Sequence, residues 1–562
     1  MHGTYATSIV QEPGCADRVG ARQRSLRVIV GLKSPVFWTV LAVAVVCALL
    51  LALPGETIAT KYLNDLFIFL DGAHRVTLGQ VPNRDFHTAL GPLNYYIPAL
   101  GYWLSGHYGG AMPVGMALVV LALAPVGAHI LDTRLRPATA IPVGAFLILV
   151  AAVPINLGEE IRSLSFAMFY NRIGWAAMGF LLLMYLAPHR PRAHQTVLDA
   201  LCAAFLVVLM LYTKVSYGAV GLGFLIFMLL ATGQRAWAAA GLVLALGSGL
   251  VIEAFWQSSV AHVSDLLMAG RVSGNLDSID EFAQVLFNNF ADFVLFGIFM
   301  VLVLVRTRSF RDSLFLGFCA GSGYLLIGQN YQNWGIVTLM AGAAVATEIL
   351  ARSQGPQTRR SIAAGAHLLL LAFLLPTIVH NAAALGLHAA LATARYGDAV
   401  PLPNFSRIRL AKLWTEGEYP AFTRYLASLE DGDKALASLE DGTADRVLVL
   451  DFVGPFSAGL GLTPPRGDST WHHWGRTLHE HNFLPPERLF ADVKVVLEPK
   501  QPVEVWTADG LRQVYAEYLG ENFEVAQETA DWKVYVARTS SDETVSQTLE
   551  PEPEDEWTRL GG

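Results

Sequence analysis

Long apolar runs separated by short polar segments fill the first 380 residues of the chain. Each run has about 18–20 residues, which as a helix is long enough to cross a hydrocarbon layer of roughly 30 Å. They predict eleven spans, near residues 36–54, 112–131, 138–155, 173–187, 196–213, 216–231, 236–255, 290–305, 313–328, 335–350 and 361–379. The pattern therefore predicts a polytopic α-helical membrane protein.

A different pattern occupies residues 61–76, directly after the first run. At 100° per residue, a helix over this stretch gathers polar and small residues within an arc of about 120°. These residues are Lys61, Asn64, Asp65, Asp71, Gly72 and Arg75. Apolar residues fill the opposite side, which is typical of a helix in the membrane interface. We expect an interfacial helix with Asp65 and Asp71 on its wet face.

The aromatic segment 93–105 (LNYYIPALGYWLS) is too short to span, so it is predicted to be interfacial as well. With the N-terminus inside, the inner segments then contain sixteen Lys and Arg residues. The outer segments before residue 380 contain seven. This excess agrees with the positive-inside rule. It predicts a cytoplasmic N-terminus, a long first outer loop over residues 55–111, and a C-terminal region on the outer face.

The composition changes after residue 390 and suggests four parts. We expect a basic cytoplasmic arm (1–35), a transmembrane domain (36–390), a C-terminal α/β domain (391–540) and a disordered acidic tail (541–562). The C-terminal domain shows strand-like runs at 446–452, 493–497, 523–528 and 532–537, and a helical pattern at 509–520.

Composition adds little beyond the membrane class. Hydrophobic residues make up 53% of the chain, charged residues 15%, and mean hydropathy is +0.42. The four cysteines lie outside the C-terminal domain and show no zinc-binding spacing, so that domain is expected to fold without disulfides. The basic arm fits an orientation signal and lipid headgroups rather than nucleic acid.

The run LDGAHRVTLGQVPNRDFHTALGPLNYY (70–96) resembles the G-Q-x-P-x-R-D-F…G-P-L pattern of many bacterial members of the GT-C superfamily of integral-membrane glycosyltransferases. Protein O-mannosyltransferases and lipid A aminoarabinose transferases belong to this superfamily. The order of arm, first span and long outer loop is similar too. Tyr170, Asn171, Arg172, Gly174 and Trp175 add a weaker likeness. The resemblance is clearest over residues 36–175 and architectural to about residue 390.

The resemblance implies that a sugar passes from a polyprenyl-phosphate donor to a glycan, lipid or protein acceptor. It places this reaction at the outer face of the bacterial cytoplasmic membrane. The family's catalytic aspartate lies early in the first outer loop, where Asp65 matches best and Asp71 is the alternative. The family often has two adjacent acids there, whereas this chain has Asn64-Asp65-Leu66. A divalent cation, Mg²⁺ or Mn²⁺, stays an open possibility.

The residue types suit this chemistry. A carboxylate can act as general base on a hydroxyl, and cations stabilise a departing phosphate. The phosphate candidates are Arg84, Arg172 and Lys214. The substrate candidates are Asp85, His87, Glu159, Glu160, Gln329, Asn330, Trp471 and His472. Simpler explanations compete: an Asp71–Arg75 pair along one helix, an Arg84–Asp85 pair in a loop, and packing for Trp471.

Two other functions remain open from the sequence. A flippase for lipid-linked sugars would show inverted repeats and ionisable groups near the bilayer midplane, whereas here charges gather at the outer interface. An O-antigen polymerase or ligase would carry its large loop late among the spans, whereas here the dense loop is the first.

Overall fold

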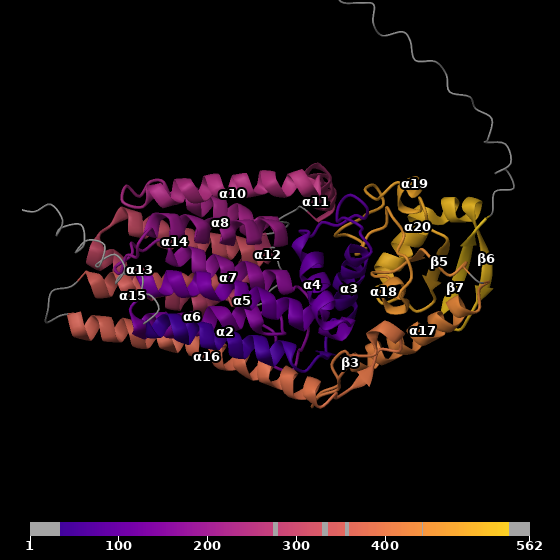
Figure 1. Ribbon diagram of the computed structural model, residues 1–562, viewed down its shortest axis with the longest axis horizontal. Helices are drawn as coiled ribbons and strands as arrows, with labels where there is room; N and C mark the ends of the chain where they lie inside the picture. The colour runs from indigo at the N-terminus through magenta and orange to yellow at the C-terminus, as the bar shows by residue number, and fades with distance from the viewer. Residues whose placement is uncertain (1–33, 274–278, 329–334, 354–358, 441, 539–562) are drawn as a thin grey trace, which may run out of the picture.

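The computed structural model describes residues 34–273, 279–328, 335–353, 359–440 and 442–538. The basic arm, the candidates Gln329 and Asn330, and the acidic tail lie outside the described residues. A bundle of long helices occupies one side of the molecule, and a smaller region with strands occupies the other (Figure 1).

Each predicted span is a helix of this bundle. The bundle helices are α2 (Pro35–Ala52), α5 (Tyr108–Arg134), α6 (Pro137–Ala152), α7 (Phe169–Leu183), α8 (Gln195–Thr213), α9 (Val215–Met228), α10 (Arg235–Trp256), α13 (Phe290–Thr307), α14 (Phe310–Gly328), α15 (Val337–Arg352) and α16 (Arg359–Thr393). By length and composition, α2, α5, α8, α10, α13 and most of α16 can cross a membrane, and α6 and α9 are shorter apolar helices. The chain is a polytopic α-helical membrane protein.

Two short helices, α3 (Leu63–Thr77) and α4 (Leu93–Ser105), lie between the bundle and the C-terminal region (Figure 1). At 1.5 Å per residue, α4 is about 20 Å long, too short to span a bilayer. The two helices pack closely: a Cβ added at Gly72 would lie 2.0 Å from the Tyr95 ring. At the same end of the bundle, α11 (Ser259–Ser273) and α12 (Ile279–Asn288) lie in the chain between α10 and α13 (Figure 1).

The prediction of a wet polar face is wrong for most of α3, although Asn64 and Asp65 at its start are partly exposed. Residues 66–76 are all buried, and Asp71 and Arg75 are only 3% and 2% exposed. The C-terminal region covers this face, and Arg75 forms an ion pair with Asp468. A contact between residues so far apart in sequence cannot be seen in a helical wheel.

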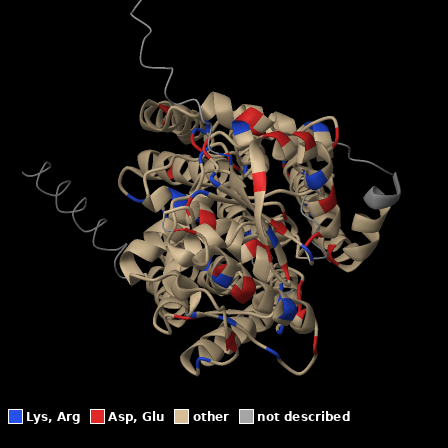
Figure 2. Cartoon of the chain, turned by 90° about the vertical axis from the view of Figure 1, so that its right-hand side faces the viewer, with Lys and Arg blue, Asp and Glu red and all other residues tan. Residues whose placement is uncertain are grey.

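The C-terminal region is α/β. Its four-stranded sheet has the order β4-β5-β7-β6, formed by β4 (Val447–Val449), β5 (Val495–Pro499), β6 (Phe523–Glu528) and β7 (Trp532–Ala537). β4 and β5 are parallel, and the other neighbours are antiparallel. The helices are α17 (Tyr419–Ala437), α18 (Phe456–Leu460), α19 (Pro486–Leu489) and α20 (Val505–Asn522). The four predicted strands and the predicted helix are thus confirmed. Acidic and basic residues are interspersed in the end view of Figure 2.

A second, small sheet joins the first outer loop to the segment after α16. β1 (Thr57–Ala59) pairs in parallel with β3 (Ile408–Leu410), and β2 (Asp398–Ala399) pairs antiparallel with β3. Beside it, the Phe67 ring of α3 stacks on Phe405 with centroids 5.3 Å apart. One hydrophobic core therefore continues from the bundle through α3 into the C-terminal region.

Candidate active site

A cavity of about 290 Å³ lies where three parts of the chain meet. These parts are the start of α3, the segment from the end of α6 to the start of α7, and a loop of the C-terminal region. The lining residues are Tyr62, Asn64, Asp65, Ile68, Phe69, Leu90, Asn156, Leu157, Gly158, Glu159, Met168, Tyr170, Asn171, Arg172, Phe452, Trp471, His473 and Arg476. The cavity therefore combines residues that lie about 400 positions apart.

Asp65 lies in the first turn of α3, with its side chain lining the cavity. Burial raises the pKa of Asp65 to about 7, although the positive charge of Arg476 opposes this rise and the negative charge of Glu418 adds to it. A carboxyl with a pKa near neutrality is partly ionised under physiological conditions and can accept a proton efficiently. The chemistry of Asp65 therefore suits a general base.

Arg172 presents an unsatisfied guanidinium to the cavity. Its Nη1 donates hydrogen bonds to the Ile155 and Ala167 carbonyl oxygens, at 2.7 and 3.4 Å. Its Nε and Nη2 atoms are buried and have no hydrogen-bond partner among the described residues. A buried donor without a partner is costly, and a fork of N–H groups matches the geometry of a phosphate or carboxylate. Arg172 is thus suited to bind an anion.

Two further cations lie beside the cavity. Lys214 follows α8, and its Nζ donates a hydrogen bond to the Asn171 Oδ1 at 3.2 Å. Arg476 comes from the C-terminal loop, with its guanidinium carbon 5.8 Å from the centroid of the Trp471 ring. Sequence reasoning missed Arg476, because no motif surrounds it and only the tertiary structure brings it to Asp65.

Polar and aromatic groups complete the lining. Both side-chain amide atoms of Asn156 are buried and have no partner among the described residues, so they can pair with a polar ligand. The Trp471 ring lies 6.2 Å from that of Phe452 and 5.7 Å from that of His473. Burial, reinforced by the charge of Arg476, lowers the pKa of His473 to about 4, so this imidazole is neutral.

The backbone is strained at two lining positions. Tyr62, before α3, has a φ of 54°, and Met168, before α7, has a φ of 48°. This left-handed conformation is unfavourable for residues with a Cβ, and such strain is concentrated at functional sites. The two residues set the directions in which α3 and α7 begin, and so the positions of Asp65 and Arg172.

The predicted candidates divide between the cavity and other places. Asp65, Glu159, Arg172 and Trp471 line the cavity, and Lys214 adjoins it through Asn171. Glu159 is at the rim, where it accepts hydrogen bonds from the Lys61 Nζ and the Tyr62 hydroxyl, both at 3.0 Å.

The other described candidates lie outside the cavity, each with a partner. Asp71 pairs with Arg75 at 2.7 Å, and Arg84 pairs with Asp85 at 3.3 Å. The remaining contacts are His87 with Asp265 at 2.8 Å, His472 with Asp468 at 3.3 Å, and Glu160 with Arg162. The competing explanations for Asp71 and Arg84, a helix pair and a loop pair, thus match the contacts observed.

A divalent cation, an open possibility from the sequence, stays a prediction. The described part of the chain contains no group of three or more His, Cys, Asp or Glu side chains arranged to hold a metal ion. The two carboxylates in the cavity lie among cations instead.

No family model and no curated protein matches the chain. Among solved structures, it is similar to the oligosaccharyltransferase of Archaeoglobus fulgidus, crystallised with Zn and sulfate. That similarity has 11% identity, a TM-score of 0.38, and coverage of 82% of this chain and 67% of the other. It is also similar to ArnT from Cupriavidus metallidurans in the apo state, with 13% identity, a TM-score of 0.44, and coverage of 92% and 98%. At these low values, we argue the function from the site geometry.

Proposed function

We propose that the protein is a membrane glycosyltransferase that moves a sugar from a polyprenyl-phosphate donor to an acceptor hydroxyl. The observation that supports this most is that an acidic and a basic side chain of suitable chemistry line one cavity: a carboxyl and a guanidinium. A carboxyl with a pKa near 7, Asp65, and a buried guanidinium with unsatisfied donors, Arg172, line the same space. A base and an anion receptor are the two groups that such a transfer requires.

The place of the cavity suits a lipid-linked donor. A polyprenyl chain stays in the bilayer, so its phosphate lies at the level of the lipid headgroups, where the spanning helices end. The cavity lies between helix α7 of the bundle and the C-terminal region. We assign Arg172, Lys214 and Arg476 to the donor phosphate, where their charges stabilise it as it leaves.

The transfer can proceed as a single displacement. Asp65 accepts the proton of the acceptor hydroxyl while the hydroxyl oxygen forms a bond to the anomeric carbon. The bond from that carbon to the phosphate oxygen breaks, and its electron pair leaves with polyprenyl phosphate. The proton then passes from Asp65 to water. Because attack and departure occur on opposite faces, the anomeric configuration inverts.

The remaining lining residues suit the sugar. Trp471 and Phe452 offer aromatic faces on which a sugar ring can stack. The amide groups of Asn156 and Asn171 can exchange hydrogen bonds with its hydroxyl groups. With the N-terminus in the cytoplasm, as the loop charges predict, the reaction takes place at the outer face of the cytoplasmic membrane.

The test is transfer by the purified full chain in lipid nanodiscs, with a panel of polyprenyl-phosphate sugars and with Mg²⁺ or Mn²⁺ varied. We expect one donor to be consumed, and Asp65→Asn to lower kcat by about 10²–10⁴-fold with donor binding retained. The matched control is Asp509→Asn, which changes an exposed acid of α20 outside the cavity and should stay within about twofold. Transfer at the wild-type rate by Asp65→Asn, or no transfer from any donor, would contradict the proposal.

A further inference from the structure

One loop of the C-terminal region, residues 462–477, lines one side of the cavity. It carries Trp471, His473 and Arg476, and it lies between α18 and α19. The loop contains no helix or extended strand of its own. Its position must therefore be fixed by contacts with other parts of the chain.

Side chains of the first outer loop provide these contacts. The Arg75 Nη1 donates to the Pro465 carbonyl oxygen at 2.6 Å, and the Arg75 Nη2 donates to the Asp468 Oδ2 at 2.7 Å. The Gln80 Nε2 donates to the Pro464 carbonyl oxygen at 2.8 Å. Three consecutive contacts thus hold the start of the loop against the end of α3.

Backbone and hydroxyl contacts extend this interface, here called the seam, between residues 75–95 and the loop 462–477. The His87 amide donates to the Asp468 carbonyl oxygen at 2.7 Å, and the Gly467 amide donates to the Asp85 carbonyl oxygen at 2.8 Å. The hydroxyl oxygens of Tyr95 and Thr470 lie 3.0 Å apart, within hydrogen-bonding distance. The sequence candidates Asp85 and His87 therefore contact this loop, which lines the cavity.

The centre of the seam is a buried ion cluster. The Arg75 Nε also donates to the Asp71 Oδ2 at 2.7 Å, so one guanidinium joins two carboxylates. Burial opposes ionisation of Asp468, but the hydrogen bond with His472 and the charge of Arg75 outweigh it and lower the pKa of Asp468. Asp468 is thus ionised at neutral pH. Its charge-assisted bonds to Arg75 are the strong kind, and they lie away from water.

Helix α3 connects this cluster to the base. Asp65 and Arg75 are on the same helix, separated by ten positions, or about 15 Å at 1.5 Å per residue. Movement of the loop relative to Arg75 would therefore also move Arg476 relative to Asp65. A rigid helix with the base at one end and the cluster at the other fixes both sides of the cavity.

We propose that Asp71, Arg75 and Asp468, here named the loop lock, are positioning residues that hold Arg476 opposite Asp65. This inference rests on the proposed function, in which Arg476 stabilises the donor phosphate. The C-terminal region is then a structural part of the active site rather than a cover over it.

The test combines Asp468→Asn with Arg476→Gln in the full chain. The probe is undecaprenyl phosphate, the lipid carrier without a sugar, and its dissociation constant is measured in nanodiscs. We expect Asp468→Asn alone to weaken binding by about tenfold, since displacement by about 1 Å can abolish a productive contact. In the R476Q background the same change should cost less than about twofold, because both changes remove one interaction.

Hydrogen exchange gives a readout independent of ligand. Amides of residues 462–477 should exchange faster in Asp468→Asn than in the wild type. If Asp468→Asn fails to fold, Arg75→Lys is the second variant, since a lysine keeps the charge but lacks the fork that reaches three acceptors. The matched control is Asp492→Asn, which alters an exposed contact to the amide of Arg466 in the same loop and should leave binding unchanged.

Equal losses of binding in the wild-type and R476Q backgrounds, or unchanged exchange of the loop, would overturn the lock. Failure of the proposed function looks different. If the wild type binds no undecaprenyl phosphate, the assignment of the donor is wrong, and the exchange measurement alone then decides whether the lock exists.

Discussion

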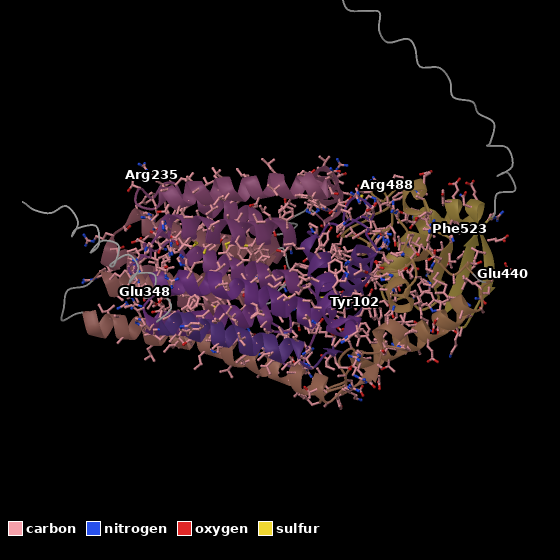
Figure 3. All side chains as sticks on the ribbon, in the orientation of Figure 1. Tyr102, Arg235, Glu348, Glu440, Arg488 and Phe523 are labelled. Atoms are coloured by element: carbon pink, nitrogen blue, oxygen red, sulfur yellow. The ribbon has the colours of Figure 1, made fainter. Side chains whose placement is uncertain are left out.

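Both ends of the helical bundle bury charged side chains, but the arginines at one end have carboxylate partners and Arg172 at the other has none among the described residues. In Figure 3, nitrogen and oxygen atoms gather toward both ends, and Glu348 marks the end away from the C-terminal region. At that end the Arg134 Nη2 is 2.8 Å from the Asp199 Oδ2, and the Arg136 Nε is 3.3 Å from the Glu348 Oε2. At the cavity end, Arg172 is equally buried but has no carboxylate partner among the described residues.

The difference separates structural charges from functional ones. A carboxylate beside a buried cation neutralises its charge locally. If one member of such a pair is removed, the other charge stays buried in a low-dielectric environment without compensation. A buried cation without such a partner keeps its potential available for an anion that arrives later. The cavity end therefore carries an energetic cost that a bound ligand can relieve.

The largest expected effect is on stability at the paired end. Asp199→Ala would leave Arg134, which is 0% exposed, without its carboxylate, and would remove the partner of His129 as well. Breaking such a buried pair costs about 3–5 kcal/mol. We expect a strong loss of folded protein, measured as the yield of monodisperse protein in detergent and as Tm. A Tm within 1–2 °C of the wild type, as roughly expected for a surface change, would contradict the comparison.

The same kind of change at the cavity end should act in the opposite direction on stability. The pKa of Asp65 is raised to about 7, so its ionised form disfavours the folded state, and the stabilising effect of the protonated form is lost as pH rises through 7. Asp65→Asn should therefore raise Tm at pH 8 relative to the wild type, although it removes transfer. An equal or lower Tm at pH 8 would argue against a strained carboxyl.

Arg172 tests the unpaired cation directly. Arg172→Gln retains a hydrogen-bonding side chain but removes the charge, and we expect transfer to fall by about 10²-fold with little loss of Tm. Arg172→Lys should recover part of the rate, because charge returns without the fork. A large loss of Tm with unchanged kcat per folded molecule would make Arg172 a structural residue instead.

The pH profile gives a smaller, more specific effect. The rate should rise with pH through about 7, because only ionised Asp65 accepts a proton. The positive charge of Arg476 lowers the pKa of Asp65, whereas the negative charge of Glu418 raises it. Arg476→Gln removes the positive charge that lowers this pKa, so the midpoint of the rate profile should move to higher pH. A midpoint that moves down or stays in place would show that Arg476 does not act on Asp65.

The smallest effect is expected at Arg84. This side chain is about half exposed and pairs with Asp85 at the surface. Surface pairs contribute at most about 1 kcal/mol. Arg84→Gln should leave both kcat and Tm within about twofold and 1 °C of the wild type, respectively. A tenfold loss of transfer would restore Arg84 as a phosphate ligand.

Local patterns predicted the elements of this fold well. The apolar runs gave every helix of the bundle, because the length of an apolar segment reflects the thickness of the membrane it crosses. The strand-like runs at 446–452 and 493–497 correspond to the edge strand β4 and its neighbour β5 in the C-terminal sheet. The helix predicted over residues 61–76 corresponds to α3, which begins at Leu63 and has Asp65 in its first turn.

The environment of those elements could not be predicted in the same way. The wheel of α3 placed Arg75 in water because it contains no information about Asp468, a residue 393 positions away. Arg476 lacks any local signal for the same reason. Glu159 lines both the cavity and a second groove, whereas its neighbour Glu160 lines only the second groove, where it pairs with Arg162. The local sequence pattern predicts which helices and strands form. Tertiary contacts determine which charged side chains are paired and which line the cavity.

The pairing of β1 with β3 has a consequence for biogenesis. During translation, Thr57–Ala59 emerges hundreds of residues before its partner Ile408–Leu410, and the helices of the bundle must be inserted in between. The small sheet, and with it the closed pocket, can form only after the ribosome has finished most of the chain. A chain that ends before residue 408 would leave Thr57–Ala59 without its partner strand, and one that ends before residue 465 would leave Arg75 without its contacts to Pro465 and Asp468.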